Sequence, residues 1–152
     1  LCGNWDLTHE GHEFIILSAA SLLGQGDLIA LVRSDDMYER QKGEPPIYNE
    51  RQRARGITAV DGVKAGIVIP TDGKDSYKFI EELFEEGSPR LYFFGPDQLD
   101  PDQPSEWNKG LMEYFPETNF CQLPRYGECS SSAIKRIIGG GISPHGRTTR
   151  RL

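Results

Sequence analysis

The sequence of 152 residues has few cysteines, few histidines and no long apolar segment. Its three cysteines, Cys2, Cys121 and Cys129, are an odd number without CxxC spacing, which indicates reduced thiols in a cytoplasmic compartment. No apolar run reaches the roughly 18 residues that span a bilayer, and no signal peptide is visible, so no membrane partner is expected. A net charge of −6 argues against nucleic acid as a partner unless basic residues are segregated.

The composition is otherwise that of one globular domain, because 37% of the residues are hydrophobic and the length suits a single core. We assign residues 1–140 to this domain and residues 141–152 to an irregular basic tail. Two short basic clusters are present: Arg51, Arg53 and Arg55 in the middle of the chain, and Arg147, Arg150 and Arg151 in the tail.

Apolar runs that suit buried strands alternate with amphipathic runs that suit helices. Strands are expected at 27–33, 65–69, 90–94 and 119–123. Helices are expected at 12–24, 48–56, 74–86, 106–115 and 130–138, with a loop over 35–47. This alternation predicts an α/β fold, a Rossmann-like parallel five-stranded sheet with helices on both faces. The first strand must precede Gly3, so it is either very short or begins before Leu1.

The most informative segment is Gly3-Asn4-Trp5-Asp6-Leu7-Thr8-His9-Glu10-Gly11-His12. His9 and His12 are three residues apart at the start of a predicted helix and therefore lie on about the same face. Free N–H groups at a helix N-terminus attract phosphate, and imidazolium groups there would hold triphosphate oxygens and stabilise developing charge. Asp6 precedes the helix and would orient an acceptor or hold a metal ion.

Two other interpretations of this segment stay open. The HExxH zinc motif fails by one residue, because position 13 is Glu13, but a His-x-x-His site with a third ligand remains possible. The pair is otherwise two surface histidines at a helix start.

Two later segments also carry candidate anion ligands. Lys42-Gly43 precedes Glu50-Arg51, and a flexible lysine suits a phosphate clamp, although a solvated loop has the same composition. In the run 123–135, Arg125 precedes Ser130, Ser131 and Ser132 at a predicted helix start, which offers a second anion cradle or an ordinary helix cap.

The first segment resembles the Gly-x-Phe-Asp-x-x-His-x-Gly-His signature of the cytidylyltransferase-like nucleotidyltransferase superfamily. Five signature positions are in register: Gly3, Asp6, His9, Gly11 and His12. Trp5 replaces the usual Phe, and Asn4 replaces the common Thr or Ser. The run 123–135 is most similar to the Leu-Pro-Arg-Thr-x-Gly-Ile-Ser-Thr-Thr-x-Ile-Lys run of glycerol-3-phosphate cytidylyltransferases, with departures that include Glu128 for Gly.

The resemblance implies an enzyme that transfers a nucleoside monophosphate from a nucleoside triphosphate to a small phosphomonoester, with Mg²⁺, and releases pyrophosphate. It implies catalytic roles for His9, His12, Lys42 and Arg125. It implies nucleotide contacts from Asn4, Trp5, Gly11, Asp97, Ser130, Ser131 and Ser132. It further implies acceptor contacts from Asp6 and Lys42. The role of Asp97 is implied by a Gly-x-Asp turn that follows the strand at 90–94. The alternative is that this segment is a plain turn.

Through this resemblance, Arg125 implies CTP as the nucleotide and the run 123–135 implies glycerol 3-phosphate as the first expectation for the acceptor. The alternative is an adenylyltransferase that uses ATP on a sugar phosphate, of the heptose-phosphate type, or on FMN. A nucleotide-binding regulatory module without turnover and a fragment of a longer enzyme are further hypotheses. Dimers are common in the superfamily, so a homodimer is expected.

Overall fold

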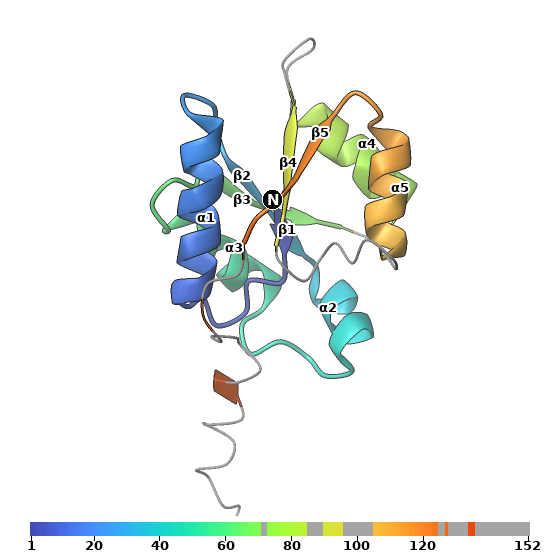
Figure 1. Ribbon diagram of the computed structural model, residues 1–152. Coiled ribbons are helices and arrows are strands. Elements are labelled where there is room, and N and C mark those ends of the chain that lie inside the picture. Colours follow the sequence, from blue (N-terminus) through green and yellow to red (C-terminus); the bar gives the residue numbers. More distant parts are fainter. Residues whose placement is uncertain (71–72, 85–89, 96–104, 125–126, 128–133, 136–152) are drawn as a thin grey trace, which may run out of the picture.

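The computed structural model describes the following residues: 1–70, 73–84, 90–95, 105–124, 127 and 134–135. Strands alternate with helices along the chain, as predicted (Figure 1). In chain order the elements are β1 (Cys2–Gly3), α1 (Glu10–Leu23), β2 (Ile29–Arg33), α2 (Asp35–Lys42), α3 (Glu50–Thr58), β3 (Ala65–Ile69), α4 (Lys74–Glu82), β4 (Leu91–Phe94), α5 (Glu106–Tyr114) and β5 (Asn119–Gln122).

All the strand pairs are parallel, but within the described residues they form two sheets where one of five strands was expected. One sheet has the order β1-β2-β3 and the other pairs β4 with β5. The reason lies in β1, which contributes only two residues to its ladder with β2 and so offers little backbone to a strand on its other side. Within the given sequence β1 spans Cys2–Gly3 and pairs with β2 at Leu31 and Val32.

The two sheets nevertheless share the same two faces. Val32 of β2 and Phe93 of β4 belong to one apolar cluster, with side chains of α1 and α3. Leu31 and Phe94, the neighbours of these residues, belong to the other cluster, with side chains of α2, α4 and α5. Figure 1 accordingly shows α1 and α5 on opposite sides of β4. Helices therefore cover both faces, as the sequence predicted.

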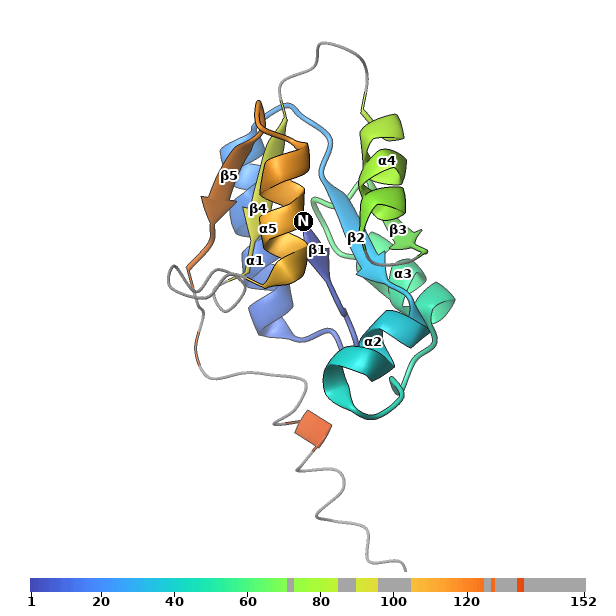
Figure 2. The ribbon, with the colours of Figure 1, turned by 90° about the vertical axis from the view of Figure 1, so that its right-hand side faces the viewer.

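The site-forming end of the fold is where the strands end. Figure 2 shows β2 and β5 running toward the end of the molecule at which α1 begins and α2 lies. Parallel α/β sheets bind ligands at this edge, where the chain order of the strands reverses. No helix in the described part of the chain is long and apolar enough to cross a membrane.

The expected loop over 35–47 is wrong for its first half, which is helix α2. Ser34 caps this helix by accepting a hydrogen bond from the Met37 N–H at 3.3 Å, and Gly43 ends it with a left-handed φ of 75°. The helix buries Met37 and Tyr38 at adjacent positions, and this single apolar pair lacks the repeat that identifies longer amphipathic helices.

The other element boundaries follow local caps. Helix α1 ends with Gly24 as its C-cap, as expected. Helix α3 begins at Glu50 because Asn49 and Gln52 form a reciprocal capping box with two hydrogen bonds of 3.0 Å. The predicted helix over 130–138 and the basic tail lie outside the described residues, except that Ile134 and Lys135 form part of a helical turn.

Candidate active site

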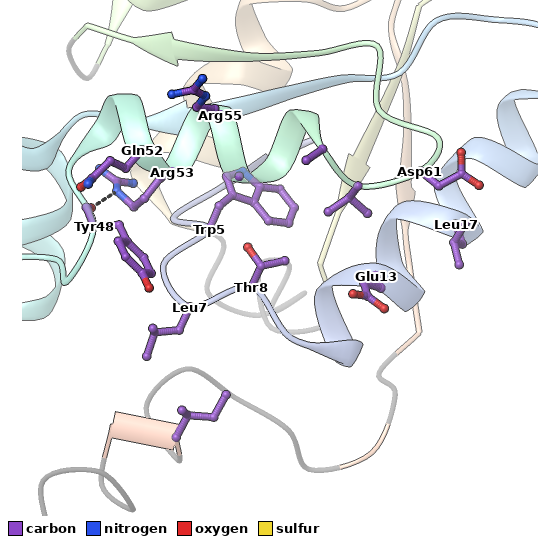
Figure 3. A pocket seen from close by; sticks show the side chains of 14 residues that line it. Trp5, Leu7, Thr8, Glu13, Leu17, Tyr48, Gln52, Arg53, Arg55 and Asp61 are labelled. Atoms are coloured by element: carbon purple, nitrogen blue, oxygen red, sulfur yellow. Dashed lines mark hydrogen bonds between the residues drawn. The ribbon is translucent and has the colours of Figure 1, made fainter.

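A cavity of about 990 Å³ opens between α1 and α3, beside the loop that joins β1 to α1 (Figure 3). We call it the α1–α3 pocket. Figure 3 shows Trp5 and Thr8 of this loop between α3 and the start of α1. Tyr48 lies at the side of the pocket away from α1. The β1–α1 loop therefore borders both the pocket and the N-terminus of α1, where the two histidines lie.

The β1–α1 loop has an unusual backbone, because Trp5 and Leu7 have positive φ angles of 55° and 52°. Tertiary contacts hold it there. The Trp5 indole is buried and donates to the Leu31 carbonyl at 2.9 Å. A Cβ at Gly3 would lie 2.7 Å from Cε2 of Trp5, so only glycine fits beneath the ring. Packing around Trp5 thus explains why this part of the motif needs glycine.

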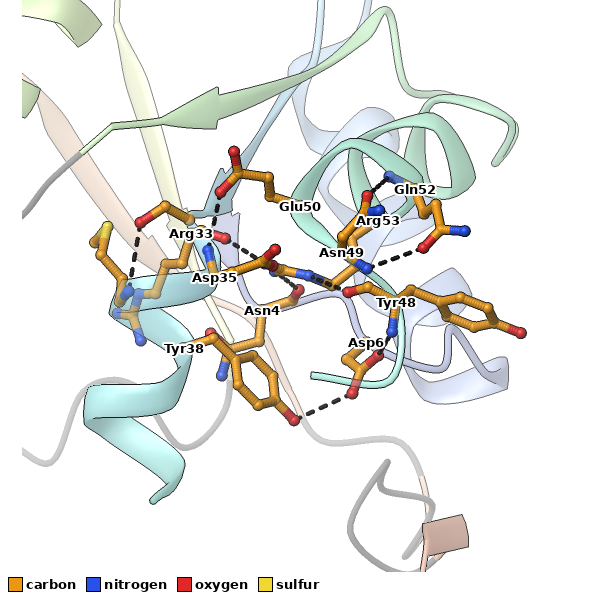
Figure 4. Close-up of polar contacts among 12 residues, drawn as sticks. Asn4, Asp6, Arg33, Asp35, Tyr38, Tyr48, Asn49, Glu50, Gln52 and Arg53 are labelled. Carbon is orange, nitrogen blue, oxygen red and sulfur yellow. Dashed lines mark hydrogen bonds and ion pairs between the residues drawn. The ribbon is translucent and has the colours of Figure 1, made fainter. Parts of the chain in front are cut away.

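Asp6 lies between these two strained residues and is almost fully buried, at 1% exposure. Its carboxylate accepts hydrogen bonds of 3.1 Å from the Tyr48 N–H and the Tyr38 hydroxyl (Figure 4). It also accepts one of 3.1 Å from the Ile47 N–H. Lys135 forms an ion pair with it, also at 3.1 Å. Burial alone would raise the pKa of Asp6, but these partners outweigh it and lower the pKa.

Asp6 therefore ties the β1–α1 loop to the segment that precedes α3. Its oxygens accept from neighbouring protein groups, and among the described residues no set of three His, Cys, Asp or Glu side chains could hold a metal ion. The described residues thus supply no cluster of three protein ligands for Mg²⁺, an ion that one or two carboxylates and substrate phosphates usually hold. The alternative zinc site at His9 and His12 finds no third ligand among them either.

Arg53 is a second buried tie, and its side chain has no exposed surface. Its guanidinium donates to the carbonyls of Asn4 at 2.6 Å, Arg33 at 2.7 Å and Tyr48 at 3.0 Å. It also forms an ion pair with Asp35 at 2.7 Å. One side chain thus joins the β1–α1 loop, the end of β2, the start of α2 and the segment before α3 (Figure 4).

This internal role of Arg53 was not predicted from the sequence, in which the residue belongs to a basic cluster with Arg51 and Arg55. The signal that could have found it is its position, because Arg53 shares the buried face of α3 with Ala54 and Ile57. An arginine on the apolar face of a short helix implies internal partners.

The two histidines lie together at the start of α1, as predicted. His9 is the N-cap residue, and its Nδ1 accepts from the Gly11 N–H at 3.1 Å. The ring of His12 lies 4.0 Å from the ring of His9 and 5.2 Å from that of Trp5, measured between centroids. Nδ1 of His12 is buried and has no hydrogen-bond partner among the described residues.

Both histidines are neutral near pH 7 in this arrangement. Burial lowers the pKa of His9, and the charge of Glu10 opposes this shift. Burial, and next the charge of His9, lower the pKa of His12 to about 4. Because Nδ1 of His9 is an acceptor, its proton is on Nε2, which is then a donor for an anion. The expected imidazolium form requires a nearby anion to raise these pKa values.

Of the remaining predicted site residues, the structure describes some and not others. The Asn4 amide donates to Gln41 at 3.0 Å, and Gly11 is buried in the first turn of α1. Lys42 is the exposed last residue of α2 and makes no hydrogen bond or ion pair with another described residue. The other predicted ligands lie outside the described residues: Asp97, Arg125, Ser130, Ser131 and Ser132.

Similarity to curated proteins extends over most of the chain. A protein of Korarchaeum cryptofilum named FAD synthase is 30% identical over 143 residues, which is 91% of this chain and 88% of that protein. The FAD synthase of Methanopyrus kandleri is 30% identical over 139 residues, covering 90% and 85% of the two chains. That of Methanothermus fervidus is 27% identical over 133 residues, covering 87% and 83%.

A solved structure shares the fold of this chain. The crystal structure of the lipopolysaccharide core biosynthesis protein of Thermoplasma volcanium has a TM-score of 0.63 at 22% identity, over 82% of this chain and 93% of that one. The family described as cytidylyltransferase-like matches residues 1–137, a range that contains all the motifs discussed above. The chain therefore belongs to the cytidylyltransferase-like family and is a nucleotidyltransferase.

Proposed function

We propose that the protein transfers the adenylyl group of ATP to the phosphate of FMN, giving FAD and pyrophosphate. The observation that carries this choice of substrates is the similarity to FAD synthases over more than 80% of the length of three relatives. It favours the adenylyl alternative of the sequence analysis over cytidylyl transfer to glycerol 3-phosphate. The histidine pair at the start of α1 supports the reaction class.

In this reaction a phosphate oxygen of FMN attacks the α-phosphorus of ATP in line. The new P–O bond forms as the bond from the α-phosphorus to the bridging oxygen breaks, and pyrophosphate leaves with the electron pair. No covalent enzyme intermediate is required, so the protein's task is to align two anions and stabilise the added charge.

The first helical turn of α1 suits this task. The Nε2–H of His9 and the free N–H groups of the turn would donate to triphosphate oxygens. Nδ1 of His12, which has no described partner, would either donate to the phosphates or take up a proton as they bind. Removing one such donor from a transition state typically slows turnover by about 10² to 10³.

The other roles follow the motif positions. Lys42 would clamp the phosphate of the acceptor, and Asp97 would border the nucleotide. Arg125 and the serines at 130–132 would bind the nucleotide and its β- and γ-phosphates. Mg²⁺ would enter with the triphosphate, because Mg²⁺ in such sites is held largely by substrate phosphates and water. For Asp6 we propose a positioning role, since its oxygens already accept from Ile47 and Tyr48.

The test is a matrix of nucleotides and acceptors in which pyrophosphate release and the chromatographic product are both measured. ATP with FMN should release pyrophosphate and yield FAD in equal amounts. CTP with glycerol 3-phosphate is the matched arm for the cytidylyl alternative and should release little. Release with the CTP arm alone would overturn the substrates. Tight ATP binding without release in any arm would favour the regulatory-module hypothesis.

A further inference from the structure

We propose that the α1–α3 pocket binds the planar ring of the acceptor, so that one acceptor molecule spans this pocket and the anion site at the start of α1. The inference rests on the proposed function and adds a subsite to it. The ligand is defined by its chemistry: a flat heteroaromatic ring with one polar edge, joined by an extended chain to a phosphate.

The walls of the pocket suit a flat apolar ring. Trp5 and Tyr48 supply aromatic surface, and Leu7 and Leu17 add aliphatic surface (Figure 3). Tyr48 and Leu17, which both line the pocket, are 46% and 50% exposed. Large apolar side chains gathered in this way around a concave site indicate that a ligand covers them.

The pocket also has a polar wall, which comes from α3. Gln52, Arg55 and Gly56 line it and are spaced at three and four residues along the helix. Arg53 also lines it, but its guanidinium is already bonded to the carbonyls of Asn4, Arg33 and Tyr48. The amide of Gln52 and the guanidinium of Arg55 supply donors to the carbonyls and ring nitrogens of a heterocycle. This pairing of apolar walls and one polar wall matches a ring with a single polar edge.

The pocket adjoins the β1–α1 loop that leads to the histidines, although neither histidine lines it. Thr8 lines it and immediately precedes the N-cap residue His9. Glu13 lines it from α1, and a helix returns to the same face after four residues, so His9 lies at the head of that face. Trp5 both lines the pocket and lies 5.2 Å from the His12 ring. A molecule with its ring in the pocket would therefore direct its phosphate chain toward the histidines.

The size of the pocket favours the acceptor over the nucleotide base. Its volume of about 990 Å³ is at the upper end of the range that ligand pockets reach, roughly 300 to 1,000 Å³. A tricyclic ring fills more of such a volume than a bicyclic purine does.

Gly56 provides the means to test this. A Cβ added at Gly56 would meet no atom within 4 Å, so a larger side chain enters open space at the pocket wall without a clash. Replacing a helical glycine also raises helix propensity. Gly56→Ala, Gly56→Leu and Gly56→Trp therefore fill the pocket in steps without destabilising the fold. Lys78→Trp, on the exposed surface of α4, is the matched control for an added indole.

The experiment titrates FMN, and separately riboflavin, by flavin fluorescence, and ATP by calorimetry, in the wild type and each variant. The Kd of FMN should rise in the order Ala, Leu, Trp, by about tenfold or more for Trp, because the ring loses its contacts. The Kd of ATP should stay within about twofold, and Lys78→Trp should bind FMN like the wild type. The Kd of riboflavin, which lacks the phosphate, should rise across the same Gly56 variants in the same order as the Kd of FMN.

Three results would overturn the proposal. Unchanged FMN binding in Gly56→Trp, with wild-type FAD formation, would remove the subsite and leave the proposed function intact. A rise in the Kd of ATP alone would assign the pocket to the nucleotide base. A change in molar mass by light scattering, with unchanged FMN binding, would make the pocket an interface between copies. Absence of FAD formation by the wild type would instead contradict the proposed function itself.

Discussion

At the scale of single residues, the site depends on His9 in two separable ways. The residue caps α1 through Nδ1, and its Nε2–H faces the anion in the proposed reaction. Asparagine caps helices well but lacks the imidazole. His9→Ala should lose about 1 kcal/mol of stability, whereas His9→Asn should retain it, and both should lower kcat by about 10² to 10³. Urea unfolding and a pyrophosphate assay measure the two effects, and near-normal turnover in either variant would contradict the role.

His12 should make the fold sensitive to mild acid. Its pKa is about 4 in the folded protein against 6.5 unfolded, so the unfolded chain binds more protons between these values. The stabilisation is present above about pH 6.5 and is lost as the pH falls toward 4. A shift of this size corresponds to a loss on the order of 3 kcal/mol.

His12→Asn removes this titration and leaves the carboxylates unchanged. The fall in the free energy of unfolding between about pH 7 and about pH 4.5 should therefore be smaller in His12→Asn than in the wild type. Urea denaturation at the two pH values measures it. An equal fall in both proteins would show that the His12 ring is not buried as described.

Arg53 should matter far more for stability than its neighbour Arg51, although the sequence places both in one basic cluster. Arg53→Met leaves the Asp35 carboxylate and the three carbonyl partners without their buried donor. A loss of about 3 to 5 kcal/mol is expected. Arg51→Met changes an exposed side chain and should alter stability by no more than about 0.5 kcal/mol. Similar unfolding midpoints for the two variants would contradict the internal role of Arg53.

At the scale of secondary structure, the sequence predicted elements where an apolar repeat was long enough. The run 65–69 matched β3 at both ends, and Gly24 marked the end of α1. The repeat failed for α2, whose buried face is a single Met37–Tyr38 pair among charged residues. The proximity of His9 and His12 was predicted because the two residues are three apart at a helix start. The buried hydrogen bonds of Asp6 and Arg53 were not predicted, since the tertiary fold alone brings their partners together.

Two glycines should respond to the same change in opposite directions. Gly43 ends α2 with a φ of 75°, which penalises any side chain, so Gly43→Ala should destabilise the fold by about 1 kcal/mol. Gly56 lies inside α3 with open space around its Cα, so Gly56→Ala should stabilise it by up to about 1 kcal/mol. Thermal unfolding of the pair measures both effects, and a shift of the same sign would contradict the described backbone.

At the scale of the whole molecule, the parallel layer is divided between two sheets whose side chains fill common cores. The single five-stranded sheet expected from the sequence is not found within the described residues, because hydrophobic patterns reveal strands but not the number of residues that each contributes to a ladder. The homodimer expected from the family stays a prediction, which light scattering would check. The division of the layer has a consequence of its own for local stability.

Backbone protection should differ between the two sheets. Strand β2 is paired on both sides, with β1 and β3, whereas β4 and β5 pair only with one another in the described residues. Two-stranded units are weakly stable alone, so their opening depends on the shared cores. Hydrogen exchange followed by mass spectrometry should find slower exchange in peptides of 29–33 than in those of 119–122. Equal protection would mean that β1 and β4 are joined by a ladder and that the five strands open as one sheet.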